Sequence, residues 1–212
     1  MPRNAGTLVE TTVLLLRHGE TALNRSGALR GHIDVPLSEN GVREARQLAA
    51  RVAAEYALAG IYSSPLVRAR ATAAEIARLT RLDVTIDERF IDVDYGAWAG
   101  RVYDTFSAEE KEAFRCWQRM PEQPLPGADD PADVQRRALV GLADRAMLGR
   151  GCIAIVTHDA ILQLVLSNLL GIDLRSYRGI VQHTATLNEV QRIAGGWRVH
   201  LVNSTWHLDD AG

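Results

Sequence analysis

Several polar residues of the kinds that handle phosphate stand directly after short strand-like runs of this sequence. The runs are residues 12–16, 60–64, 84–86 and 152–157, and the polar residues that follow them are Arg17, His18, Arg68, Asp92, His158 and Asp159. A phosphoryl group carries negative charge on three equatorial oxygens, which fixed cations and hydrogen-bond donors stabilise. A neutral imidazole can attack phosphorus and form a phosphohistidine, and a carboxylic acid can protonate the leaving oxygen. These residue types therefore indicate phosphoryl transfer.

No metal or nucleotide motif accompanies these residues. The sequence has no Walker loop and no group of Asp, Glu and His with the spacing of Mg²⁺ ligands. Its two cysteines, Cys116 and Cys152, lack the spacing of a zinc site or of a disulfide framework. We therefore expect no metal site and no cofactor.

The elements that must position these residues alternate between strands and helices. Besides the four strands above, helical spacing of apolar residues predicts helices from the N-cap Ser38 through Val52 and over 66–79, 133–148 and 160–170. Residues 186–193 and 197–203 alternate in polarity around a turn and predict a hairpin. This order predicts an α/β fold with a mostly parallel central sheet, helices on both faces and an antiparallel edge strand. Ligands bind beyond the carboxyl ends of such strands, where the polar residues stand.

The stretch over residues 95–131 has a different character from its surroundings. It contains three glycines and four prolines, and only residues 108–117 show a short helical pattern. We expect a small cap-like insertion there. The length of 212 residues otherwise predicts one domain over 1–212.

Composition narrows the classes of partner. The chain has 24 basic and 26 acidic residues and a net charge of −2, which gives no electrostatic footprint for nucleic acid. No apolar run approaches the length of a membrane span or a signal segment. We therefore expect a soluble cytoplasmic protein that binds a small phosphorylated substrate, without nucleic acid or membrane partners. The exposed edge of the predicted hairpin could pair with a second copy of the chain, so a homo-oligomer is possible.

Three segments carry a specific resemblance to a known family. They read LLLRHGETALN, SSPLVRARATA and VTHDA, with GHIDVPLSENG between the first two. In this order and spacing they resemble the histidine phosphatase superfamily, also called the phosphoglycerate mutase-like family. The resemblance covers about residues 13–203, nearly the whole chain.

The resemblance implies a role for each matching residue. His18 stands in the place of the nucleophile that becomes phosphorylated. Arg17, Arg68 and His158 match the phosphate pocket, and Asn24 matches a further donor to the phosphate. A turn residue is the alternative for Asn24.

Two aspartates compete for the role of proton donor. Asp92 lies at the family's spacing from Tyr95 and Gly96, although the family usually has Glu there. Asp159 follows His158 directly, as in the acid-phosphatase branch, where that Asp gives the proton. The alternative for Asp159 is a purely structural role, as the N-cap of the next helix. The more specific spacing favours Asp92.

The contacts with the rest of the substrate depart from the family pattern. The family's Arg after the Asn is Ala28 here, and Arg30 stands two positions later, so Arg30 and Gly31 become candidate substrate contacts. The family's Trp-Glu-Gly is Trp98-Ala99-Gly100. The sequence does not name the substrate.

Three functions follow, in order of preference. The first is a metal-independent phosphomonoesterase that hydrolyses a small phosphorylated metabolite through a phosphohistidine. The second is a phosphoglycerate mutase, which would need a second phosphate site. Residues 95–131 carry four basic against seven acidic residues, which disfavours such a site within the insertion. The third is a non-catalytic phosphate-binding module, which the intact His18 and His158 disfavour.

Overall fold

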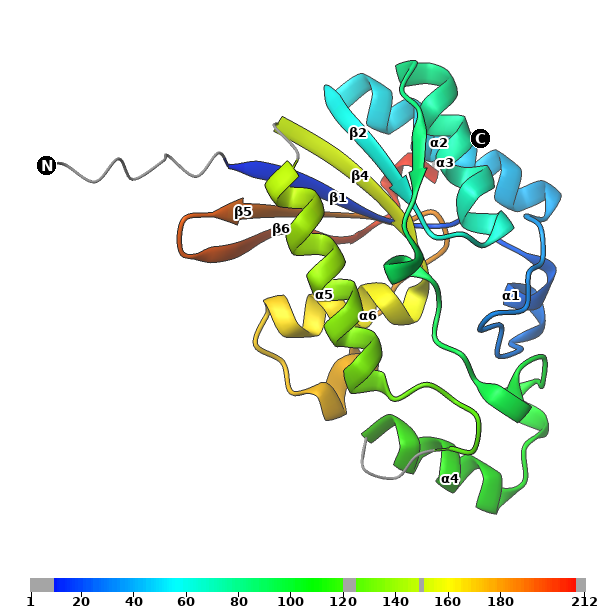
Figure 1. Ribbon diagram of the computed structural model, residues 1–212. Coiled ribbons are helices and arrows are strands. Elements are labelled where there is room, and N and C mark those ends of the chain that lie inside the picture. The colour runs from blue at the N-terminus through cyan, green and yellow to red at the C-terminus, as the bar shows by residue number, and fades with distance from the viewer. Residues whose placement is uncertain (1–9, 120–124, 149–150, 209–212) are drawn as a thin grey trace, which may run out of the picture.

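Six strands form one mixed sheet in the order β3-β2-β4-β1-β5-β6. The computed structural model describes residues 10–119, 125–148 and 151–208 (Figure 1). The strands are β1 (Thr11–Arg17), β2 (Leu58–Ser63), β3 (Val84–Ile86), β4 (Gly151–Thr157), β5 (Leu187–Ile193) and β6 (Gly196–Ser204). β1 to β4 run parallel, and β5 and β6 form an antiparallel hairpin at one edge. The predicted sheet class and the edge hairpin are confirmed.

The central strand β1 supplies both hydrophobic cores, since successive side chains of a strand point to opposite faces. Val13 and Leu15 pack with α5 (Pro131–Leu148) and α6 (Asp159–Leu169). Leu14 and Leu16 pack on the other face with α2 (Glu39–Glu55) and α3 (Val67–Thr80). All four side chains are buried. The helices therefore cover both faces of the sheet, as the continuous apolar run predicts.

The loop after β1 is held against the start of α2. Ser38 caps α2 by accepting a hydrogen bond from the Gly41 amide at 3.0 Å, as predicted. A Cβ on Gly19 would overlap the Gly41 carbonyl oxygen, so this close approach requires glycine. The short helix α1 (Ala22–Ser26) lies in the same loop, and the sequence analysis did not predict it.

Residues 96–119 form two 3₁₀ turns, η2 (Gly96–Trp98) and η3 (Tyr103–Thr105), followed by α4 (Ala108–Arg119). Aromatic rings hold this segment together, with Phe114 stacked on Trp98 at 5.5 Å and beside Trp117 at 5.4 Å. Figure 1 shows α4 at the opposite end of the molecule from α2 and α3. The described residues contain three further 3₁₀ turns. η1 (Glu88–Phe90) precedes Asp92, η4 (Leu174–Gly179) follows α6, and η5 (Trp206–Leu208) follows β6.

No helix in the described ranges combines the length and the apolar character that crossing a membrane requires.

Candidate active site

His18 is the first residue after β1 and is completely buried. Its amide donates to the Thr157 carbonyl at 3.1 Å, and its carbonyl accepts from the Ala185 amide at 3.0 Å. These bonds extend the β1 pairings to β4 and β5, so the backbone of His18 is fixed from both sides. The sheet itself therefore sets the position of this side chain.

The neighbouring backbone sets the tautomer of His18. Nδ1 lies 2.6 Å from the Gly19 carbonyl oxygen, which can only accept, so Nδ1 carries the proton and Nε2 keeps its lone pair. Nε2 is buried and has no hydrogen-bond partner among the described residues. Burial, followed by the nearby His158, Arg68, Arg17 and Arg30, lowers the pKa of His18 well below 6.5. The ring is therefore neutral at pH 7 and presents a free nitrogen.

His158 stands beside His18, with 5.2 Å between the ring centroids. The parallel pairing of Arg17 with Thr157 explains this, because each histidine is the next residue on its strand. Nε2 of His158 lies 2.7 Å from the Ser64 hydroxyl, and Nδ1 lies 3.8 Å from Oδ2 of Asp92. Burial first, and then Arg68, lowers the pKa of His158 well below 6.5.

Three arginines surround the two histidines with spare N–H donors. Arg17 is anchored by a bond from Nη1 to the Gln182 carbonyl, and Arg68 donates to the Gly31 and Ile33 carbonyls at 2.8 Å each. Nε of Arg17, of Arg30 and of Arg68 is buried without a hydrogen-bond partner in the part of the chain that the structure describes. An arginine remains protonated even when burial lowers its pKa, as it does for Arg17 and Arg68. The site is therefore strongly cationic and holds unused donors.

Asp92 is tied into this cluster. Its Oδ2 accepts from Nη2 of Arg68 at 3.2 Å, and its Oδ1 accepts from the Val93 amide at 3.0 Å. The Asp92 carbonyl is held by Arg137 at 3.0 Å and by Nε2 of His32 at 2.9 Å. The structure thus places Asp92 beside both a predicted phosphate ligand and His158.

Asp159 has a different setting, in the first turn of α6. The N-cap residue of α6 is His158, so the alternative that Asp159 caps this helix is wrong. Oδ1 of Asp159 is buried and has no hydrogen-bond partner in the described ranges. Its charge acts on Arg17 and on Arg178. Asp159 therefore lies at the edge of the cluster, on the side of η4.

Asn24 and Gly31 make backbone-directed contacts. The Asn24 Oδ1 accepts from the Thr21 amide at 2.9 Å and hydroxyl at 2.8 Å, forming a capping box at the start of α1. Asn24 therefore lies in a helix, and the alternative that it is a turn residue is wrong. Its side-chain oxygen is used in the cap, so only its amide N–H groups are left to donate to a phosphate. The carbonyl of Gly31 accepts a hydrogen bond from Arg68, so Gly31 helps to position the guanidinium group of Arg68.

A sequence model of the histidine phosphatase superfamily, branch 1, matches residues 13–205. The chain belongs to this superfamily. It is 33% identical over 167 residues to phosphoserine phosphatase 1 of Hydrogenobacter thermophilus, covering 78% of this chain and 79% of that one. It is 31% identical over 212 residues to the probable phosphoglycerate mutase GpmB of Proteus mirabilis, covering 93% and 95%. The structure of Bacillus stearothermophilus YhfR superposes with a TM-score of 0.85 at 26% identity, covering 93% and 99%.

The chain is therefore an enzyme of the histidine phosphatase type, a phosphoric monoester hydrolase. The residues of this histidine phosphatase that contact the cluster but were not singled out from the sequence include Ser64, Arg137 and Gln182. Ser64 stands inside the SSPL segment, which was a usable signal. Arg137 and Gln182 act from an ordinary helix and a loop, and nothing in the sequence around them marks a site.

Ser64 is the hydrogen-bond partner of Nε2 of His158. Because the Ser64 oxygen already accepts from the Leu66 amide at 3.3 Å, we infer that its hydroxyl donates to Nε2 of His158. On this assignment the proton of His158 lies on Nδ1, 3.8 Å from Oδ2 of Asp92. We expect Ser64→Ala to lower kcat/KM about tenfold, since a buried imidazole nitrogen loses its partner. Nitrogen NMR shifts of His158 should change from a pure Nδ1–H form to a mixture.

Ser63→Ala is the matched control for this prediction. Ser63 is equally buried, but its hydroxyl donates to the Ser64 carbonyl at 2.9 Å instead of to a histidine. Equal losses in the two variants, with His158 unchanged in the NMR spectrum, would show that Ser64 acts only through packing.

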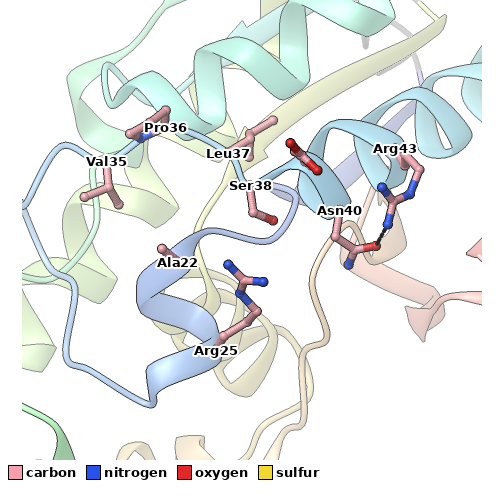
Figure 2. A pocket seen from close by; sticks show the side chains of 9 residues that line it. Ala22, Arg25, Val35, Pro36, Leu37, Ser38, Asn40 and Arg43 are labelled. Carbon is pink, nitrogen blue, oxygen red and sulfur yellow. Dashed lines mark hydrogen bonds between the residues drawn. The ribbon is translucent and has the colours of Figure 1, made fainter.

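One cavity of this histidine phosphatase lies apart from the cluster. Its volume is about 490 Å³, and it is bounded by α1, residues 35–38 and the first turn of α2. Figure 2 shows Arg43 turned away to bond with Asn40, and Arg25 on the other side of the cavity. None of the candidate site residues lines it, so we assign it no part in the chemistry.

Proposed function

We propose that this enzyme hydrolyses the monoester of a small phosphorylated metabolite through a phosphohistidine at His18, without a metal ion. The observation that carries the proposal is the buried, unprotonated Nε2 of His18 beside arginine N–H groups that lack partners among the described residues. A nucleophile for phosphorus needs a lone pair that no proton occupies. The equatorial phosphate oxygens need donors that are already in place.

In the proposed mechanism, Nε2 of His18 attacks phosphorus as the bond to the leaving oxygen breaks. Arg17, Arg68 and His158 stabilise the equatorial oxygens, with Asn24 and Arg30 as further donors. Asp92 gives its proton to the leaving oxygen and then takes a proton from the water that attacks the phosphohistidine. Inorganic phosphate leaves, and His18 is restored.

The relatives support a small substrate. The Hydrogenobacter relative is named for phosphoserine, and the Proteus relative for phosphoglycerate. Both named compounds are short phosphorylated acids, so we infer that this enzyme acts on molecules of that size.

The mutase remains the second candidate because of the GpmB relatives. Incubation with 3-phosphoglycerate separates the two functions: a phosphatase releases inorganic phosphate, and a mutase yields the 2-isomer. We expect free phosphate and one alkali-stable phosphoryl group per chain during turnover. Isomer without free phosphate would establish the mutase. Free phosphate without any phosphoryl-enzyme would contradict the phosphohistidine mechanism.

Chelation is expected to leave activity unchanged. Arg17, Arg30 and Arg68 already supply positive charge where the phosphate is proposed to lie, so no cation is needed to offset it. Phosphate release should be measured after dialysis against EDTA. EDTA saturated with Mg²⁺ serves as the control for binding of the chelator itself. Activity lost in EDTA and restored by Mg²⁺ or Mn²⁺ would contradict a metal-independent mechanism.

A further inference from the structure

Arg137, a residue of α5, holds two carbonyl groups of the stretch that leads into the candidate site. Its Nη1 donates to the Arg89 carbonyl at 2.7 Å, and its Nη2 donates to the Asp92 carbonyl at 3.0 Å. Residues 91–94 belong to no helix or strand, so their backbone groups must find partners elsewhere. One planar guanidinium group therefore fixes both ends of the stretch 89–92.

Two further side chains hold the same stretch. The Thr157 hydroxyl donates to the Phe90 carbonyl at 2.7 Å. Nε2 of His32 lies 2.9 Å from the Asp92 carbonyl, which can only accept, so this nitrogen donates. Thr157 is the last residue of β4 and precedes His158, so the stretch is tied to the strand end that carries that histidine. The backbone of Asp92 is thus placed relative to the site by contacts from three separate elements.

The carboxyl group of Asp92 follows its backbone closely. A single methylene separates this group from Cα, so side-chain rotation cannot compensate for a displaced backbone. Oδ2 lies 3.2 Å from Nη2 of Arg68 and 3.8 Å from Nδ1 of His158. Proton transfer to a leaving oxygen requires hydrogen-bond distance, and a displacement of about 1 Å can cost about a hundredfold in rate. The contacts that fix the Asp92 carbonyl therefore also fix the reach of its carboxyl group.

We propose that Arg137 is a positioning residue for the reaction, which acts by holding the Asp92 carboxyl group in line with the phosphate ligands. This inference rests on the proposed function, in which Asp92 protonates the leaving oxygen. Both acceptors of Arg137 are neutral carbonyls, so the planar fork and not the charge alone performs this task. The charge of Arg137 also acts on His158. Lysine would keep that charge, but its single nitrogen cannot reproduce the fork.

Arg137→Lys is therefore the test variant, assayed with two substrates that differ in leaving group. With 3-phosphoglycerate, whose leaving alkoxide needs a proton, we expect kcat to fall about tenfold. With p-nitrophenyl phosphate, whose leaving group needs none, kcat should change less than about twofold. Arg136→Lys is the matched control, since Arg136 is the neighbouring residue of α5, is exposed and pairs with Asp133. It should leave both rates unchanged.

A double-mutant cycle shows whether Arg137 acts through Asp92. In the Asp92→Asn background, Arg137→Lys should cause no further loss with 3-phosphoglycerate, because the group that it positions no longer gives a proton. Equal losses with the two substrates, or losses that add in the double variant, would show that Arg137 only stabilises the fold and would overturn the inference.

A spectroscopic measurement separates this inference from the proposed function. The carboxyl carbon NMR signal of Asp92, assigned by its absence in Asp92→Asn, reports the surroundings of that group without turnover. We expect Arg137→Lys to shift this signal and Arg136→Lys to leave it in place. A shift in Arg137→Lys supports the positioning role even if no phosphohistidine forms. An unshifted signal overturns that role even if the phosphatase activity is established.

Discussion

Replacing His18 by alanine is expected to lower kcat/KM by at least about a thousandfold. The reason is specific to this geometry. Nε2 of His18 is the unprotonated nitrogen, because the Gly19 carbonyl holds the proton on Nδ1. The other histidine described at the site, His158, cannot present the same free lone pair, because its Nε2 is engaged by Ser64. Phosphate release from several substrates gives the measurement.

Two controls keep this result interpretable. Thermal unfolding should show that His18→Ala remains folded, because the backbone bonds at position 18 do not depend on its side chain. His200→Ala removes an exposed histidine of β6 that bonds to Gln191, and it should retain full activity. A folded His18→Ala enzyme with more than about a thousandth of the wild-type activity would rule out nucleophilic catalysis by His18.

The second large effect concerns the proton donor. We expect Asp92→Asn to lower kcat by about a hundredfold or more with an alkyl phosphate, whose leaving alkoxide needs a proton. With p-nitrophenyl phosphate the loss should be far smaller, because nitrophenolate leaves without one. Asp92 lies 3.2 Å from Arg68 and 3.8 Å from His158, two proposed phosphate ligands.

Asp159→Asn is the comparison variant for that experiment. The charge of Asp159 acts on Arg17 and Arg178, but Asp159 forms no ion pair within 4.0 Å among the described residues. If its loss depends on the leaving group and that of Asp92→Asn does not, the two roles are exchanged. If neither loss depends on the leaving group, a carboxylic acid is not the donor, and His158 becomes the next candidate.

The sheet and its cluster could be predicted because buried parallel strands are continuous apolar runs with polar residues at their ends. The strands came within two residues of their observed bounds; β2, for example, begins at Leu58 instead of residue 60. The pairing of Arg17 with Thr157 then brings the two histidines together. The alternation of strands and helices was sufficient for this part, because β1 to β4 run parallel and their carboxyl ends lie at one edge of the sheet.

Other features depend on contacts that no local pattern contains. The sequence analysis did not predict α1, which is only five residues long, although Thr21 and Asn24 have the spacing of a capping box. The tautomers of His18 and His158 depend on a carbonyl and a hydroxyl brought close by folding.

The place of β1 in the sheet has a consequence for how the protein acquires its structure. β1 pairs only with β4 and β5 among the described strands, and both lie in the last third of the chain. During synthesis on the ribosome, the apolar residues Val13–Leu16 therefore cannot pair with β4 and β5 until most of the polypeptide has emerged. Closing such a long loop lowers the entropy of the chain before the stabilising contacts form, so this pairing is slow. Until it forms, the apolar strand stays exposed and prone to aggregation. Because those same pairings position His18, the proposed phosphoryl transfer to His18 requires β4 and β5 to have paired with β1 first.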